Sequence, residues 1–117
     1  MAGGVVLVVD DDQGVREASA EMLRGEGYSV VEAADATMAL DQLRDDGIDA
    51  VILDVRMPDH DGFWVLDQLE NLPPVILVTA HSYERKAMEK LEKVSHYLQK
   101  PVEPSELLWA VAKVMAA

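Results

Sequence analysis

Carboxylates follow two apolar runs in this 117-residue sequence. The run Val5–Val9 leads into three consecutive acids at positions 10–12, and the run at positions 51–53 leads into Asp54. Apolar runs without polar alternation are typical of parallel strands that are covered on both faces. Ligands of such sheets bind beyond the carboxyl ends of the strands. We therefore expect the acids to meet at one rim of a parallel sheet.

Carboxylates that are held close together repel one another. At about 4 Å each pair costs ~1 kcal/mol in water and ~4 kcal/mol at an effective dielectric constant near 20. Asp10, Asp11 and Asp54 would therefore destabilise the fold unless a cation compensates for them. An all-oxygen site that is open to water suits Mg²⁺ or Mn²⁺. Without Asp54 the run of acids indicates a solvated turn, and with Asp54 a metal site is the favoured interpretation.

A hydroxyl and an ammonium group are expected at the same rim. Thr79 follows the apolar run at positions 75–78, and Lys100 follows the strand-like segment His96–Gln99. Each residue alone has an ordinary explanation, as a structural strand threonine and as a solvated lysine. Beside a metal-bound carboxylate, both groups can face the oxygen charge that develops in phosphoryl transfer.

Helical patterns alternate with the strand-like runs. A second strand is expected at positions 28–33, and Asp35 is expected to cap the helix after it. Five helices are expected from apolar residues at helical spacing: Val15, Ala18, Met22 and Leu23; Ala36, Ala39, Leu40 and Leu43; Phe63, Leu66 and Leu69; Ala87, Met88 and Leu91; and Leu107, Leu108, Val111, Val114 and Met115. Five βα units predict a three-layer α/β sandwich, with one domain over residues 1–117. A closed eight-unit barrel needs ~250 residues.

Composition excludes several classes of protein. The sequence contains no cysteine, so a disulfide framework or a thiolate metal site is excluded. A net charge of -12 argues against direct binding of a nucleic-acid backbone, which needs clustered Lys and Arg. No apolar run reaches the ~20 residues that cross a bilayer, and no signal peptide precedes the first strand. We expect a cytoplasmic protein without a membrane partner.

Four motifs make the chain resemble the receiver domain of two-component response regulators over essentially its full length. The motifs are Val8-Val9-Asp10-Asp11, Asp54-x-x-Met57-Pro58 followed by Asp61-Gly62, Val78-Thr79-Ala80, and Tyr97-x-x-Lys100-Pro101. Four motifs in this order and at suitable separations are highly specific. The resemblance implies a flavodoxin-like fold with strand order 2-1-3-4-5, as in chemotaxis receivers.

The resemblance implies that Asp54 is the phosphoacceptor. The donor would be a phosphohistidine on a sensor histidine kinase or a histidine phosphotransfer protein. Asp11, Asp54 and the backbone carbonyl of Arg56 would bind Mg²⁺ directly, and Asp10 would act through water. A domain of this kind is no dedicated enzyme, because it catalyses only its own phosphorylation and a slow autodephosphorylation.

The resemblance also implies roles for residues around the acceptor. Thr79 and Lys100 would hold the transferred oxygens, and Thr79 with Tyr97 would form the switch. The peptide bond between Lys100 and Pro101 would be cis. Arg56 and His81 would tune the lifetime of the phosphoryl group. The alternatives for Tyr97 and for the Arg56–His81 pair are an ordinary strand tyrosine and two solvated loop residues.

Two departures from the family pattern affect the helices. The segment between Asp54 and Thr79 is short, so a clipped third helix is expected. The sequence Val94-Ser95-His96 replaces a small-residue step before the last strand, which leaves the end of the fourth helix open. Activated receivers often form homodimers through their last helices, and Trp109 there is either a partner contact or a half-buried packing residue.

Two other functions remain as alternatives. One is a phosphatase or phosphotransferase with a nucleophilic aspartate, such as members of the haloacid-dehalogenase family. Those enzymes have a second acid two residues after the nucleophile, where this chain has Arg56. The other is a receiver-like interaction domain that is not phosphorylated, against which the intact acid cluster, Thr79 and Lys100 argue.

Overall fold

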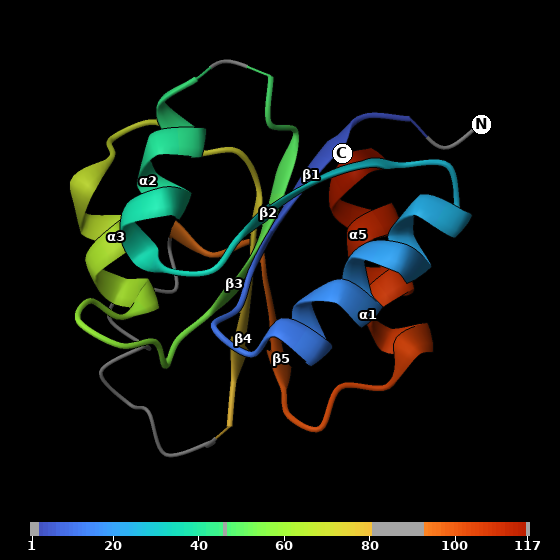
Figure 1. Cartoon of the computed structure of the whole chain (residues 1–117). Coiled ribbons are helices and arrows are strands. Elements are labelled where there is room, and N and C mark those ends of the chain that lie inside the picture. Colours follow the sequence, from blue (N-terminus) through green and yellow to red (C-terminus); the bar gives the residue numbers. More distant parts are fainter. Residues whose placement is uncertain (1–2, 46, 81–92, 117) are drawn as a thin grey trace.

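The computed structural model describes residues 3–45, 47–80 and 93–116. Its elements are β1 (Val5–Val9), α1 (Gln13–Gly25), β2 (Ser29–Ala33), α2 (Ala36–Arg44), β3 (Ala50–Asp54), α3 (Gly62–Gln68), β4 (Val75–Thr79), β5 (His96–Gln99) and α5 (Pro104–Ala116). The five strands form one parallel sheet in the order β2-β1-β3-β4-β5 (Figure 1). The predicted strand order is confirmed.

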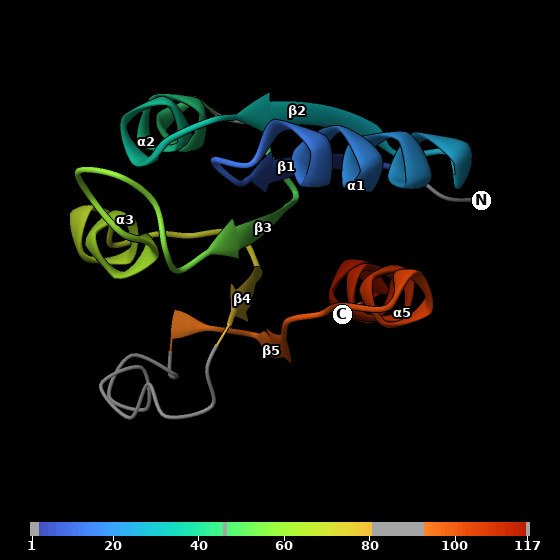
Figure 2. The ribbon, with the colours of Figure 1, turned by 60° about the horizontal axis from the view of Figure 1, so that its bottom comes forward.

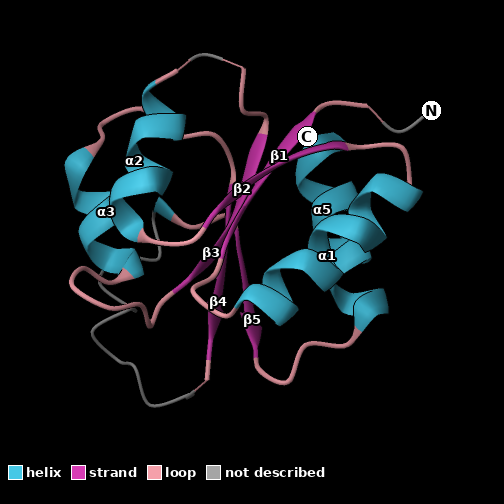
Figure 3. Cartoon of the chain, viewed as in Figure 1, coloured by secondary structure: helices cyan, strands magenta, loops and turns pink. Residues whose placement is uncertain are grey.

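Among the described residues, the sheet lies between two pairs of helices. Helices α2 and α3 cover one face, and α1 and α5 cover the other (Figures 2 and 3). Every residue of β3 and β4 is buried. Two core clusters, one on each face, contain alternate residues of the central strands, such as Ile52 on one face and Leu53 on the other. Burial on both faces explains why these strands show no polar alternation in the sequence.

The strand register brings the chemical groups to one rim. Val9 lies opposite Leu53, Asp54 lies opposite Val78, and Thr79 lies opposite Gln99. Parallel strands that end in register deliver the residues that follow them to the same edge. This edge is at the bottom of Figure 1, where β1, β3 and β4 lead into their loops.

Aspartates start three of the helices. The side chains of Asp12, Asp35 and Asp61 each accept a hydrogen bond from the backbone N–H three residues on, at the N-termini of α1, α2 and α3. Each satisfies a donor that has no partner within its helix. The prediction for Asp35 is confirmed. Helix α3 has only 7 residues, as expected from the short segment, and it ends before Leu69.

The stripe predicted for α1 is only partly packed. Leu23 is fully buried, but Val15 is 45% exposed. Val15, Ala18 and Met22 line a cavity, and Met22 also packs against the core cluster on this face of the sheet. The expected fourth helix, with Ala87, Met88 and Leu91, lies outside the described residues. In the part of the chain that is described, no helix is long and apolar enough to span a bilayer.

Candidate functional site

Three carboxylates converge where β1 and β3 end. One oxygen each of Asp10, Asp11 and Asp54 lies within 4.8 Å of the others. Asp10 and Asp54 are 6% and 4% exposed, and Asp11 is exposed. The structure thus brings together the three acids that the sequence placed at one rim. Hard oxygen donors with one side open to solvent form a donor set that fits Mg²⁺, which keeps several of its waters in proteins.

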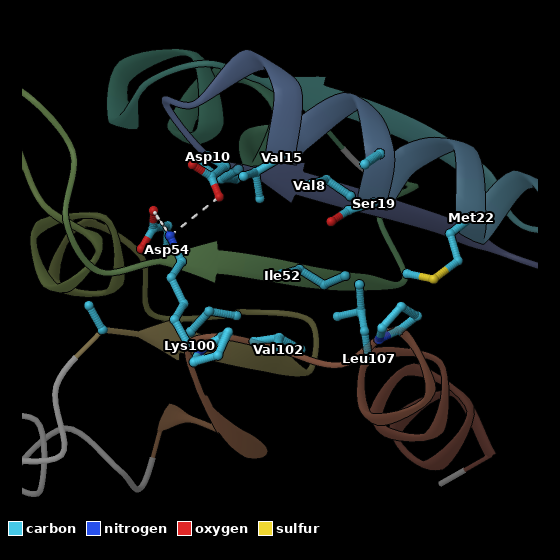
Figure 4. Close-up of a pocket in the computed structure, with 16 residues that line it drawn as sticks. Val8, Asp10, Val15, Ser19, Met22, Ile52, Asp54, Lys100, Val102 and Leu107 are labelled. Carbon is cyan, nitrogen blue, oxygen red and sulfur yellow. Dashed lines mark hydrogen bonds and ion pairs between the residues drawn. The ribbon is translucent and has the colours of Figure 1, made fainter.

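Lys100 is the cation of this cluster. Its Nζ donates a hydrogen bond to Asp54 Oδ2 at 3.0 Å and lies 3.6 Å from Asp10 Oδ2 (Figure 4). Its backbone N–H donates to the carbonyl of Thr79 at 2.7 Å. The bond to Thr79 extends the β4–β5 ladder beyond the strands, so the sheet itself positions the lysine. The Lys100–Pro101 peptide bond is cis, as the resemblance to receiver domains implied.

Burial and charge act on Asp54 in opposite directions. Burial raises the pKa of Asp54 to about 6, and the Asp10 charge adds to the rise, against the hydrogen bond and charge of Lys100 and the backbone N–H of Arg56. Burial lowers the pKa of Lys100, but the hydrogen bond and charge of Asp54 and the charge of Asp10 outweigh it, so this pKa lies above its usual value. The ammonium group is therefore retained, while the carboxylate lacks part of the cationic stabilisation that it needs.

The other predicted site residues lie around this cluster. Thr79 ends β4 and is 1% exposed. Arg56 and Asp11 line a hollow of about 550 Å³ on the solvent side of the acids. Tyr97 is half-buried against the core cluster on the face covered by α2 and α3, a placement that leaves its switch role a prediction. His81 lies outside the described residues.

Gly62 allows α3 to start directly against the acceptor strand. Its N–H donates to the carbonyl of Val55 at 2.8 Å. A Cβ at this position would lie 2.7 Å from the backbone oxygen of Asp54 and 3.2 Å from the Cα of Val55. Only glycine allows this approach without a shift of the backbone, so Gly62 helps to set the position of Asp54.

A cavity of about 640 Å³ opens beside the acids (Figure 4). Its walls are apolar and come from the sheet, α1 and α5, and they include Ile52, Val102 and Leu107. Asp10, Asp54 and Lys100 form its only charged end among the residues described. No pattern in the sequence predicted this space, because it depends on how α1 and α5 are spaced over the sheet.

A family comparison agrees with this geometry. The family model of the response regulator receiver domain matches residues 6–112. The chain belongs to the receiver domains of response regulators. It is therefore part of a two-component system, and phosphoryl transfer to an aspartate is the general mechanism of its family. Receiver domains are not dedicated enzymes in general.

The curated relatives are longer than this receiver domain. The response regulator MprA of Mycolicibacterium vanbaalenii is 41% identical over 107 residues, which cover 88% of this chain and 46% of the relative. MprA of Mycobacterium tuberculosis strain H37Rv is 40% identical with the same coverage of both chains. The chain thus spans about half the length of the curated relatives that it matches.

Solved receiver structures share the whole fold. A CheY-like receiver domain protein of Methanospirillum hungatei superposes with a TM-score of 0.90 at 26% identity, over 98% of this chain and 95% of that chain. The response regulator TrrA of Thermotoga maritima, solved in complex with Mg²⁺ and BeF, has a TM-score of 0.85 at 32% identity, over 95% and 98% of the two chains. The flavodoxin-like fold is therefore confirmed.

The far end of the receiver domain carries an exposed aromatic residue. Trp109 on α5 is 55% exposed. Its ring meets the ring of His96 edge-on at 5.1 Å, and Lys113 Nζ lies 4.8 Å from the Trp109 ring centroid. This exposure contradicts the alternative that Trp109 is a half-buried packing residue, although its ring has contacts on β5 and α5. A partner contact through Trp109 stays a prediction.

Proposed function

We propose that this receiver domain accepts a phosphoryl group on Asp54 from a phosphohistidine, carried by a sensor histidine kinase or a histidine phosphotransfer protein. The observation that carries the proposal is the contact of Lys100 Nζ with Asp54 Oδ2 at 3.0 Å, inside a cluster of three acids. Asp54 is nearly buried, with Lys100 on one side and the acids Asp10 and Asp11 close by, of which Asp11 is exposed. This arrangement leaves room for a divalent cation at the acids and for a phosphoryl group on Asp54.

The transfer is a displacement at phosphorus. An oxygen of the Asp54 carboxylate forms the new O–P bond while the P–N bond to the donor histidine breaks, and the nitrogen keeps the bonding electrons. Lys100 neutralises one phosphoryl oxygen, and the Thr79 hydroxyl donates to another. Asp10, Asp11, Asp54 and the Arg56 carbonyl would hold Mg²⁺ (or Mn²⁺), which when bound stabilises the charge of the phosphoryl oxygens.

Phosphorylation changes the charge balance around Lys100. An added group of about -1.5 to -2 charge attracts Lys100 and Thr79 away from their metal-free positions. Thr79 ends β4 and Lys100 follows β5. Movement of these two side chains would therefore alter the face formed by β5 and the last helices. Movement of Tyr97 with Thr79 would then switch that face, which could serve a homodimer or another partner.

Labelling by a small phosphoryl donor tests the acceptor. Native protein with acetyl phosphate and Mg²⁺ should gain one phosphoryl group by intact mass, and Asp54→Ala should gain none. Asp41→Ala, the same change on the exposed side of α2, should be labelled like the native protein. Equal labelling of native protein and Asp54→Ala would exclude Asp54. Loss of the label over time in the native protein measures autodephosphorylation.

A further inference from the structure

A partly buried ion pair lies behind the acidic loop. Arg16 on α1 and Glu32 on β2 are in contact, with Nε and Oε1 3.2 Å apart. Their side chains are 14% and 28% exposed. A partly buried ion pair is screened by salt less than a fully exposed one. The two residues are 16 positions apart in the sequence and lie outside the four motifs, so the sequence did not predict their contact.

Arg16 also reaches the acids themselves. Its Nη1 donates a hydrogen bond to the backbone carbonyl of Asp10 at 2.9 Å. A planar guanidinium presents its donors in a rigid fork, so one group can bind Glu32 and the Asp10 carbonyl at once. Asp10 is held on its other side too, because its N–H donates to the carbonyl of Ala33 at 3.2 Å.

The carbonyl that Arg16 holds belongs to the peptide between Asp10 and Asp11. The orientation of this peptide sets the direction in which Asp11 leaves the strand. Asp11 is the exposed member of the cluster, in a loop of three residues between β1 and α1. Inside this loop, the Asp12 N–H donates to Asp10 Oδ1 at 2.9 Å. Arg16 therefore links Glu32 on the edge strand β2 to the peptide that orients Asp11.

We propose that Arg16, held by Glu32, is a positioning residue that orients the Asp10–Asp11 peptide so that the three carboxylates converge on a divalent cation. The inference rests on the proposed function, since it concerns the same metal site. Outer contacts that orient metal ligands typically change affinity 10–100-fold when they are removed. Arg16 would have this effect without touching the metal or the phosphoryl group.

Arg24 supplies a matched control. Its Nη2 lies 3.5 Å from the other carboxylate oxygen of Glu32, and the same atom donates to the carbonyl of Val30 on β2. Arg24→Ala therefore removes an arginine and an ion pair with the same glutamate. It leaves the contact with the Asp10 carbonyl in place, so only Arg16→Ala tests the positioning role.

The test measures Mg²⁺ affinity by isothermal titration calorimetry, without any phosphoryl donor. Arg16→Ala should weaken binding about tenfold or more, and Arg24→Ala less than twofold. Arg16→Lys should fall between the native protein and Arg16→Ala, because one ammonium cannot reproduce the fork. Equal affinities for Arg16→Ala and Arg24→Ala would overturn the proposal. If Arg16→Ala does not fold, Arg16→Lys and Glu32→Gln decide: native affinity in both would overturn it.

A second readout needs no metal. In the metal-free protein, the Asp12 amide should exchange its hydrogen faster in Arg16→Ala than in Arg24→Ala, because its acceptor Asp10 is less firmly held. Equal exchange would argue against positioning. These measurements separate two failures: native protein that binds no Mg²⁺ would contradict the proposed function, while normal binding that is insensitive to Arg16 would contradict only this inference.

Discussion

At the scale of single residues, Asp54 has two conflicting requirements. A nucleophilic carboxylate must be ionised, but a group that is 4% exposed loses most of the water that stabilises its charge. Lys100 compensates for one negative charge in a cluster of three acids. The pKa of about 6 for Asp54 reflects the remaining deficit without a metal. A bound divalent cation would favour the ionised form and so lower the pKa.

This conflict predicts that Asp54→Asn stabilises the metal-free protein. The folded-state pKa of about 6 lies above the ordinary aspartate pKa of 3.8, so the native state binds the proton more tightly than the unfolded chain does. The stability of the wild type therefore falls as the pH rises from about 4 to about 6. Asparagine removes this loss, with a gain of at most ~3 kcal/mol at pH 7, from ~1.4 kcal/mol per pKa unit.

Urea unfolding in EDTA between pH 4 and pH 7 measures the effect. The free energies of unfolding of the two proteins should lie closest near pH 4, separate as the pH rises to about 6, and differ by a constant amount above that. Asparagine keeps an oxygen that can accept the Lys100 hydrogen bond, so the comparison mainly removes the titration. A difference that stays constant across this pH range would show that desolvation of the carboxylate is not its cause.

At the scale of the elements, the strand ends were predictable and the spaces between helices were not. The runs that end at Val9 and Asp54 have an unambiguous local pattern, and parallel pairing then brings their ends together. Val15 has the spacing of a core residue yet is 45% exposed, because its environment depends on how far α1 lies from α5. The Arg16–Glu32 pair likewise requires the contact between α1 and β2, which no local pattern contains.

The start of α3 predicts a strong effect of Gly62→Ala. The added methyl would lie 2.7 Å from the Asp54 backbone oxygen, so the helix or the acceptor strand must shift. Overpacking of this kind typically costs ~1–3 kcal/mol of stability, and the shift should also slow phosphoryl acceptance. Urea unfolding and the rate of labelling by acetyl phosphate measure the two effects.

Gly25→Ala is the matched control. A Cβ at Gly25, the last residue of α1, would meet nothing within 4 Å. Alanine should therefore leave labelling unchanged and alter stability by less than ~1 kcal/mol. The close approach of α3 to Asp54 would be unimportant if the two alanine variants behaved alike.

At the scale of the whole molecule, the net charge of -12 raises the energy of the compact state. Any salt screens this repulsion, so stabilisation by Mg²⁺ alone would not reveal a site. We predict that part of the stabilisation by Mg²⁺ is specific, and that this part remains when MgCl₂ and NaCl are compared at the same ionic strength. With Mg²⁺ at 100 times its dissociation constant, the gain over NaCl should be ~2.7 kcal/mol.

The specific part should disappear when one metal ligand is changed. Asp11→Asn alters the exposed acid of the cluster and changes the net charge by only one unit, so general screening remains nearly the same. Thermal unfolding in Mg²⁺ and in NaCl at equal ionic strength should give different midpoints for the native protein and equal midpoints for Asp11→Asn. Equal midpoints for the native protein would mean that Mg²⁺ acts only as a screening ion, and the acid cluster would then need another explanation.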